Sequence, residues 1–191
     1  MTSIAQIKIG GIKLTKSIVI VISGVTAGGK TTLINELHKE FIDSKVISFD
    51  DYSIDAFPSA PPIETPVQEA VNQYDLRPLM KDVLSAKDRF SFIFIDFPFG
   101  YKHTMLESYI TKTVYVKTPL DIVFARQIVR DYYNKSTEEI TNWAKIYLDS
   151  ARQIFIDHEY FVSEDADLII DGTLPLAEQL KFVKKALQLK N

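Results

Sequence analysis

A strand, a glycine-rich turn and the start of a helix follow one another near the beginning of the chain. Residues 18 to 22 read Ile-Val-Ile-Val-Ile, and such a β-branched apolar run is typical of a parallel strand buried on both faces. The residues from Gly24 to Thr32 then fit the pattern G-x-x-x-x-G-K-[ST] without a mismatch. Apolar residues recur at helical spacing from 33 to 41. This order predicts an α/β chain that begins with a phosphate-binding loop.

The glycine turn is expected to hold the phosphates of a nucleoside triphosphate. Consecutive backbone N–H groups in such a turn, together with the positive end of the following helix, form a nest for anions. Lys30 is expected to reach the β- and γ-phosphates, and the Thr31 hydroxyl to hold Mg²⁺. The alternative, a glycine turn with a lysine by chance, is disfavoured by the flanking strand and helix. The residues predicted to bind the nucleotide are Gly24, Thr26, Ala27, Gly28, Gly29, Lys30, Thr31 and Thr32.

Length, composition and charge favour a single soluble domain. The 191 residues suffice to bury a full core, and the absence of cysteine excludes disulfides and Cys-ligated metals. With 22 basic and 25 acidic residues the net charge is −3, so no basic surface for nucleic acid is expected. The apolar run at 18 to 22 is far too short to span a bilayer. We expect a cytoplasmic protein whose partner is a small molecule, not a membrane or a nucleic acid.

Strands and helices alternate along the rest of the chain. This alternation predicts a parallel sheet covered by helices on both faces, a three-layer α/β/α arrangement, in one domain from 17 to 191. Residues 1 to 16 form an extension in which the Gly-Gly pair at 10 and 11 predicts a β-hairpin. The further strands are expected at 46–49, 90–96, 113–116 and 166–170, and the further helices at 76–87, 118–133, 138–157 and 175–189.

Acidic residues stand at the ends of two expected strands, where ligands bind in parallel α/β sheets. Asp96 closes an apolar run, the placement of a carboxylate that holds Mg²⁺ directly or through water; it could instead cap the turn at 97–100. Asp50 follows the second strand and could orient an acceptor hydroxyl and take its proton. Alternatively, Asp50 and Asp51 are a solvated loop pair.

Two arginines on one helix are candidates for stabilising a transferring phosphoryl group. Arg126 and Arg130 lie four residues apart and therefore share one helical face. Their guanidinium groups would neutralise the charge of the phosphates. In the alternative interpretation Arg130 and Asp131 are surface charges at a helix end. Arg152 could support the same site or pair with an exposed acid.

A long loop is expected from 53 to 73, since it contains four prolines. Tyr74 and Asp75 follow at its close, and Tyr74 is the best aromatic candidate for contact with a flat ring. Three histidines show no shared spacing for a metal or a proton relay and are expected at the surface: His38, His103 and His158.

Taken in order, these features resemble the uridine kinase and nicotinamide riboside kinase group of P-loop kinases, with phosphoribulokinase and bacterial pantothenate kinase as more distant relatives. The resemblance spans residues 18 to about 171. It implies five parallel strands in the order 2-3-1-4-5, ATP with Mg²⁺ as donor, and transfer to a primary hydroxyl, typically the 5′-OH of a ribose. It rests on residues 23–32, residues 46–52, the pair Tyr74-Asp75, Arg126 with Arg130-Asp131, and residues 147–152 leading to 166–170.

The resemblance also implies roles for single residues. Asp50 matches the catalytic aspartate, and Asp96 matches the acidic metal residue, which is usually Glu in nicotinamide riboside kinases. Tyr74 would lie by the base and Asp75 would contact ribose hydroxyls. The chain departs from uridine kinases because it lacks their Phe-Asp-His-Pro-Asp-Ala stretch, and the region between Asp51 and Tyr74 matches neither group.

Other functions stay open at this point. The acceptor could be another small hydroxyl compound, such as a sugar or a vitamin like pantothenate, or the chain could be a nucleotide-binding regulatory module without transfer activity. A switch-type GTPase is disfavoured, because Asn134-Lys135 is followed by Ser136-Thr137 and not by the Asn-Lys-x-Asp guanine reader.

Overall fold

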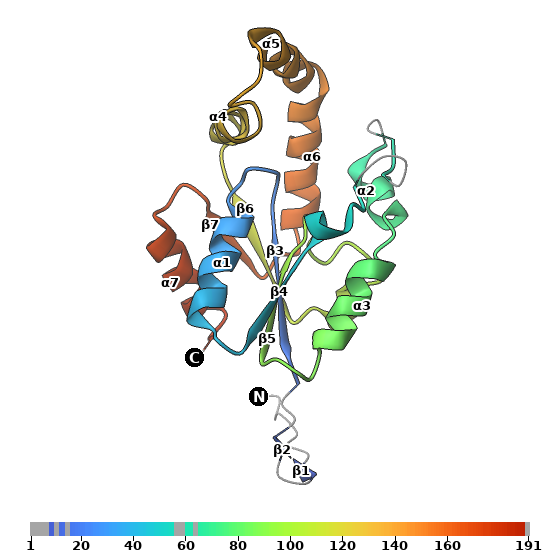
Figure 1. The fold of residues 1–191 in the computed structure, drawn as a ribbon, viewed down its shortest axis with the longest axis vertical. Coiled ribbons are helices and arrows are strands. Elements are labelled where there is room, and N and C mark those ends of the chain that lie inside the picture. The colour runs from blue at the N-terminus through green and yellow to red at the C-terminus, as the bar shows by residue number, and fades with distance from the viewer. Residues whose placement is uncertain (1–7, 10–11, 14–15, 56–59, 63–64, 190–191) are drawn as a thin grey trace.

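A parallel sheet of five strands organises the chain in this computed structural model, which describes residues 8–9, 12–13, 16–55, 60–62 and 65–189 (Figure 1). The strand order is β4-β5-β3-β6-β7, so the strand before the phosphate-binding loop lies at the centre. This confirms the predicted order 2-3-1-4-5. The strands are β3 (Ile18–Ser23), β4 (Ser44–Ser48), β5 (Phe92–Asp96), β6 (Lys112–Lys117) and β7 (Leu168–Asp171).

The register of the central strands brings their carboxyl ends to one edge of the sheet. Asp96, the last residue of β5, lies opposite Ile22 of β3 and opposite Ser48 of β4. Each of these strands therefore ends within a residue or two of the others. The phosphate-binding loop and the segment with Asp50 both leave the sheet at this edge.

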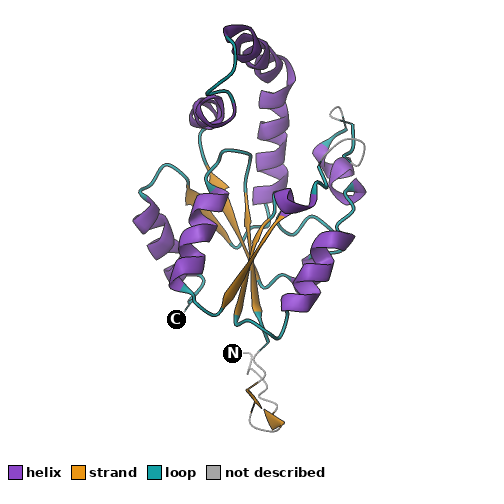
Figure 2. Cartoon of the chain, viewed as in Figure 1, coloured by secondary structure: helices purple, strands orange, loops and turns teal. Residues whose placement is uncertain are grey.

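Helices cover both faces of the sheet and confirm the three-layer arrangement (Figure 2). Helices α1 and α7 pack on one face, and α3 and α6 lie on the other. No described helix has both the length and the apolar character needed to cross a membrane. The helices are α1 (Lys30–Glu40), α2 (Val67–Ala70), α3 (Arg77–Ala86), α4 (Leu120–Asp131), α5 (Thr137–Ile146), α6 (Arg152–Ser163) and α7 (Leu176–Ala186).

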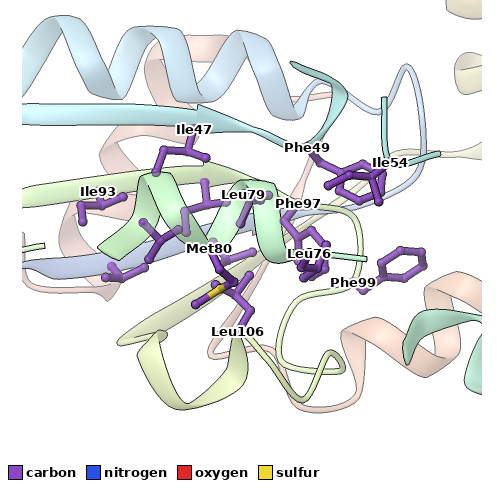
Figure 3. Packing of buried hydrophobic residues seen from close by; sticks show 14 of the residues in the cluster. Ile47, Phe49, Ile54, Leu76, Leu79, Met80, Ile93, Phe97, Phe99 and Leu106 are labelled. Carbon is purple, nitrogen blue, oxygen red and sulfur yellow. The ribbon is translucent and has the colours of Figure 1, made fainter. Parts of the chain in front are cut away.

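The core on the α3 face extends to the edge where the strands end (Figure 3). Phe49 directly follows β4, and its ring meets Phe97 edge-to-face with centroids 5.6 Å apart. Phe97 meets Phe99 in the same way, also at 5.6 Å. These buried aromatic rings fix the starts of the loops that follow β4 and β5, so the polar residues beside them are held on a rigid base.

The helix predicted over 138–157 is instead two helices joined by a π-helical turn. Residues Tyr147–Ala151 form this turn between α5 and α6. A π turn inserts one residue into the helical repeat and so rotates the face that follows it. Tyr147 anchors the turn, since its hydroxyl donates to the Leu120 carbonyl at 3.0 Å and its ring lies 4.6 Å from that of Phe124.

The N-terminal extension contains a short antiparallel pair. Strand β1 (Lys8–Ile9) pairs with β2 (Ile12–Lys13), Ile9 opposite Ile12. The glycine pair predicted to turn the hairpin, at 10 and 11, lies outside the described residues.

Candidate nucleotide and acceptor site

The loop between β3 and α1 is packed closely against β6. Gly24 has a φ of +142°, and a Cβ at this position would lie 2.7 Å from the Val116 carbonyl oxygen, so only glycine fits. The Gly28 carbonyl accepts a hydrogen bond from Thr118 Oγ1 at 2.7 Å. Helix α1 begins at Lys30, directly after Gly29 at φ +107°. The loop is thus fixed at the N-terminus of a helix, as anion binding requires.

A cavity of about 640 Å³ opens over this loop and the start of α1. It holds most of the residues predicted to bind nucleotide, together with Asp50, Arg126 and Arg130; Asp96 is not among its lining residues. Gly24 and Gly28 do not line it: Gly24 lines a neighbouring cavity, and Gly28 is buried beneath the loop. The lining residues are Thr26, Ala27, Gly29, Lys30, Thr31, Thr32, Asp50, Arg126, Arg130, Gly172, Leu174, Leu176 and Gln179.

Lys30 places a partly buried amine at the loop end of the cavity. Its Nζ donates to the Val25 carbonyl at 3.2 Å. Burial lowers the pKa of Lys30, whereas the nearby carboxylates of Asp96 and Asp50 raise it. An ammonium group enclosed in this way would gain strongly from an anionic ligand.

Thr31 and Asp96 form an oxygen pair suited to Mg²⁺. Thr31 Oγ1 donates to Asp96 Oδ2 at 2.6 Å. Burial raises the pKa of Asp96, and Lys30 and Thr31 lower it. In the described part of the chain no three His, Cys, Asp or Glu side chains gather into a metal site. Mg²⁺ in phosphate sites needs only one or two protein oxygens besides phosphates and waters, so the pair fits it.

Asp50 lies on a single 3-10 turn, Phe49–Tyr52, that follows β4. Its side chain lines the cavity near Lys30 and Arg130, whose pKa values its charge raises. The adjacent Asp51 is exposed and does not line the cavity. Asp50 is exposed as well, but of the two carboxylates it is the one that lines the cavity.

Helix α4 brings both predicted arginines to the cavity, where each already has protein partners. Arg126 donates to the Gly28 carbonyl at 3.4 Å and to the Gly172 carbonyl at 3.3 Å, so it bridges two cavity walls. Arg130 donates to Thr26 Oγ1 at 3.1 Å and pairs with Asp131 at 2.7 Å. Arg152 lies elsewhere, on a separate groove between α4 and the π-helical turn.

A second cavity, of about 390 Å³, lies on the other side of the loop. Thr26 lines both cavities. The walls of the second cavity are mostly apolar and come from the Pro-rich loop, α2, the turn after β5 and α6. They are Gly24, Val25, Thr26, Asp55, Ala60, Pro61, Pro62, Thr65, Val67, Ala70, Tyr74, Pro98, Phe99, Ile154, Phe155 and His158.

The structure separates the predicted pair Tyr74-Asp75. Tyr74 lines the second cavity with its ring 5.3 Å from that of Phe99. Asp75 is exposed, does not line the cavity, and binds Arg77 at 2.6 Å. The hydrogen bonds from Arg77 hold the pKa of Asp75 at about 2. Contact between Asp75 and ribose hydroxyls stays a prediction, and it would require the ion pair with Arg77 to open.

Two of the three histidines are buried, which corrects the expectation that all lie at the surface. His103 is 2% exposed; its Nε2 lies 3.1 Å from the Tyr74 carbonyl, and its Nδ1 accepts from Met105 N–H at 3.2 Å. His158 is 8% exposed and lines the second cavity. Burial lowers its pKa to about 4, and the charge of Lys30 adds to this effect. Residue spacing could not predict the burial of these two histidines, because their contact partners are distant in sequence.

Sequence reasoning also missed the far wall of the first cavity. Gly172, Leu174 and Leu176 follow β7, and Gln179 stands on α7. The rule that ligands bind beyond strand ends would have pointed to this segment, since β7 ends at Asp171.

The comparisons with known proteins concern the fold. No family model matches the chain, and no curated protein matches it. Three solved structures are similar over nearly the whole chain. The protein TT1252 of Thermus thermophilus has a TM-score of 0.60 at 19% identity, covering 93% of this chain and 100% of that one. Shikimate kinase of Bacteroides thetaiotaomicron has a TM-score of 0.57 at 14% identity, and the match covers 90% of this chain and 99% of that one. Thymidylate kinase of Candida albicans has a TM-score of 0.56 at 14% identity, and the match covers 92% of this chain and 96% of that one. At these identities the likeness shows the fold alone, which this chain shares with a shikimate kinase and a thymidylate kinase.

Proposed function

We propose that the chain transfers the γ-phosphoryl group of ATP to a hydroxyl of a small molecule without negative charge, with the 5′-hydroxyl of a nucleoside as the best fit. The observation that carries the proposal is the pair of cavities on either side of the phosphate-binding loop, with Thr26 in both. One cavity has the polar groups for a triphosphate, and the other has an aromatic wall for an acceptor. The kinase fold of the structural neighbours agrees with this assignment.

The residues of the first cavity supply the chemistry of transfer. Asp50 takes the proton of the acceptor hydroxyl as its oxygen bonds to the γ-phosphorus, and the bond to the β,γ-bridging oxygen breaks to release ADP. Lys30 and Arg130 stabilise the charge that spreads over the phosphates. Thr31 and Asp96 would hold Mg²⁺, which neutralises phosphate charge when it is bound.

The charges near the second cavity disfavour an anionic acceptor. No lysine or arginine is among the described residues that line the second cavity. The sequence between 46 and 76, which includes the residues that the structure does not describe there, also contains none. It contains six acids: Asp50, Asp51, Asp55, Glu64, Glu69 and Asp75. Acids outnumber bases in this part of the chain, which disfavours carboxylates such as shikimate and pantothenate and phosphates such as thymidylate as acceptors.

The shape and composition of the second cavity favour a flat ring. Tyr74 and Phe99 lie with their rings tilted by 32° and together offer an aromatic surface. Stacking on such a surface suits a nucleobase better than a sugar or a short branched chain. A sugar or vitamin acceptor, and a regulatory module without transfer activity, are the alternatives to this proposal.

A single panel experiment tests the proposal. Purified protein with MgATP is offered ribonucleosides, nicotinamide riboside, free sugars and pantothenate, and acceptor-dependent ADP release is measured, with Lys30→Ala as the background. We expect release with a nucleoside and little with pantothenate. ATP binding without release on any acceptor would favour the regulatory module, and a best acceptor that carries a carboxylate would overturn the charge argument.

A further inference from the structure

The two ends of the nucleotide cavity differ in chemistry. Lys30, Thr31 and Arg130 make the loop end polar and charged. At the far end, Leu174 and Leu176 form an apolar wall after β7. When phosphates bind at the loop, this far end is left for the base of the nucleotide, and apolar walls suit its flat faces.

Gln179, on α7, lines this far end beside the leucines, and Arg126 also reaches it at the Gly172 carbonyl. Gln179 is only 7% exposed. Its Nε2 donates to the Leu174 carbonyl at 2.8 Å. An amide oxygen turned toward that carbonyl would be repelled, so this hydrogen bond fixes the orientation of the amide. The free atom of Gln179 is therefore the acceptor, Oε1.

Oε1 has no donor among the described residues, and it is not sealed off. The side-chain polar atoms that are both enclosed and unpaired in the described part of the chain belong to Gln127, Trp143 and His158. Gln179 is absent from this set and makes its one side-chain hydrogen bond through Nε2, so Oε1 is unpaired and not fully enclosed, on a residue that lines the cavity. A largely buried acceptor without a partner is unfavourable, so a ligand that donates at this point is selected.

We propose that Gln179 makes the site selective for adenine over guanine nucleotides. Oε1 accepts a hydrogen bond from the amino group at C6 of adenine. Guanine has a carbonyl oxygen at C6, so two acceptors would face each other and Oε1 would lose its partner. The proposal rests on the proposed function only in that the cavity binds a nucleoside triphosphate, and it does not depend on the acceptor.

Binding measurements without any acceptor test this selectivity. Isothermal titration calorimetry compares the Mg²⁺ complexes of three non-hydrolysable triphosphates: AMP-PNP, GMP-PNP and the purine riboside analogue that lacks the 6-amino group. We expect the wild-type protein to bind AMP-PNP about 10- to 100-fold more tightly than either of the others. In Gln179→Met, which keeps the length but not the amide, AMP-PNP affinity should fall toward that of the deaminated analogue. Gln153→Met, at an exposed position on α6, is the matched control.

The outcomes separate this inference from the proposed function. Equal wild-type affinity for AMP-PNP and the deaminated analogue, or for AMP-PNP and GMP-PNP, would overturn the role of Gln179 even if Gln179→Met failed to fold. A clear adenine preference with no ADP release on any acceptor would leave the role of Gln179 intact and remove the kinase. Failure to bind any of the three nucleotides would overturn both.

Discussion

The surroundings of Lys30 disfavour the charged form of its side chain. Burial lowers the pKa of its ammonium group, and Asp96 and Asp50 only partly offset this effect. A carbonyl, that of Val25, is the hydrogen-bond partner that the structure gives to Nζ. The phosphates of a nucleotide would supply the missing counter-charge, so in the proposed kinase this residue would act on both nucleotide affinity and the rate of transfer.

Replacing Lys30 should therefore affect both binding and turnover. We expect Lys30→Ala to abolish measurable transfer and to weaken MgATP binding, because a charge over the β- and γ-phosphates acts in the ground state and in the transition state. Steady-state ADP release and calorimetry measure the two effects. Lys81→Ala, at an exposed position on α3, should change neither. Wild-type turnover in Lys30→Ala would contradict the assignment of the site.

Asp50 and Asp51 form a natural pair of variant and control. Asp50→Asn keeps the shape of the side chain but removes the base, so turnover should drop by roughly 100-fold or more while MgATP affinity persists. Asp51→Asn changes an adjacent carboxylate that does not line the cavity, so it should stay within about twofold of wild type. Equal losses in the two variants would mean that the loss reflects the charge of the turn and not a proton transfer.

The loop residues that line the first cavity could be predicted because they belong to one contiguous motif. The order of acids at strand ends likewise predicted that Asp50 and Asp96 would lie near Lys30. The acceptor side was less predictable. Asp75 turns outward because Arg77, two residues on, binds it, and His103 turns inward because its ring meets the Tyr74 carbonyl. Neither contact leaves a periodic signal in the sequence.

At the scale of elements, α4 connects two walls of the first cavity. Arg126 ties the Gly28 carbonyl of the loop to the Gly172 carbonyl after β7. One turn later, Arg130 reaches Thr26, the residue shared by the two cavities. The i, i+4 spacing predicted that both guanidinium groups would reach one site, but it did not predict that the first of them already holds the walls of that site.

The two arginines should consequently differ in their kinetic effects. Arg130→Ala should lower kcat by at least about 10-fold with a smaller change in ATP affinity, because the charge that it meets is largest as the phosphoryl group moves. Arg126→Ala should also weaken ATP binding, because it loosens two cavity walls. Steady-state kinetics and calorimetry separate kcat from affinity, with Arg152→Ala on the separate groove as control. Unchanged kcat in Arg130→Ala would contradict this division.

The bend between α5 and α6 shows the limit of periodicity as a predictor of elements. The apolar spacing over 138–157 fits one straight helix, but Tyr147 meets the Leu120 carbonyl and the Phe124 ring on α4 and fixes the π-helical turn there. A single inserted residue changes the spacing too little to be visible in the sequence. The turn matters for the site because the α6 face that follows it supplies Ile154, Phe155 and His158 to the second cavity.

At the scale of the whole molecule, the layers were predictable and the interlayer contacts were not. Alternating strands and helices dictate a parallel sheet between two layers of helices, and the resemblance to P-loop kinases implied its strand order. His158 shows what the pattern leaves out. It crosses from α6 to the sheet, where its ring lies 6.2 Å from that of Tyr115 and 5.7 Å from that of Phe99.

This buried histidine should make the stability of the whole molecule depend on pH. Burial lowers its pKa from 6.5 to about 4, with the charge of Lys30 adding to the shift and the Pro98 carbonyl opposing it. Between these values the unfolded chain takes up a proton that the folded chain excludes. The free energy of unfolding should therefore fall by up to about 3 kcal/mol as the pH drops from 6.5 to 4, and the loss should level off below that range.

Urea unfolding at pH 7 and at pH 4.5 measures the difference in His158→Gln, with the exposed His38→Gln as control. The pKa of His103 is lowered too, but that residue is present in both variants and in the wild type, so its contribution cancels in the comparison. We expect the drop in the free energy of unfolding between the two pH values to be smaller in His158→Gln than in the wild type and unchanged in His38→Gln; the same drop in both variants would mean that His158 does not titrate as its burial requires.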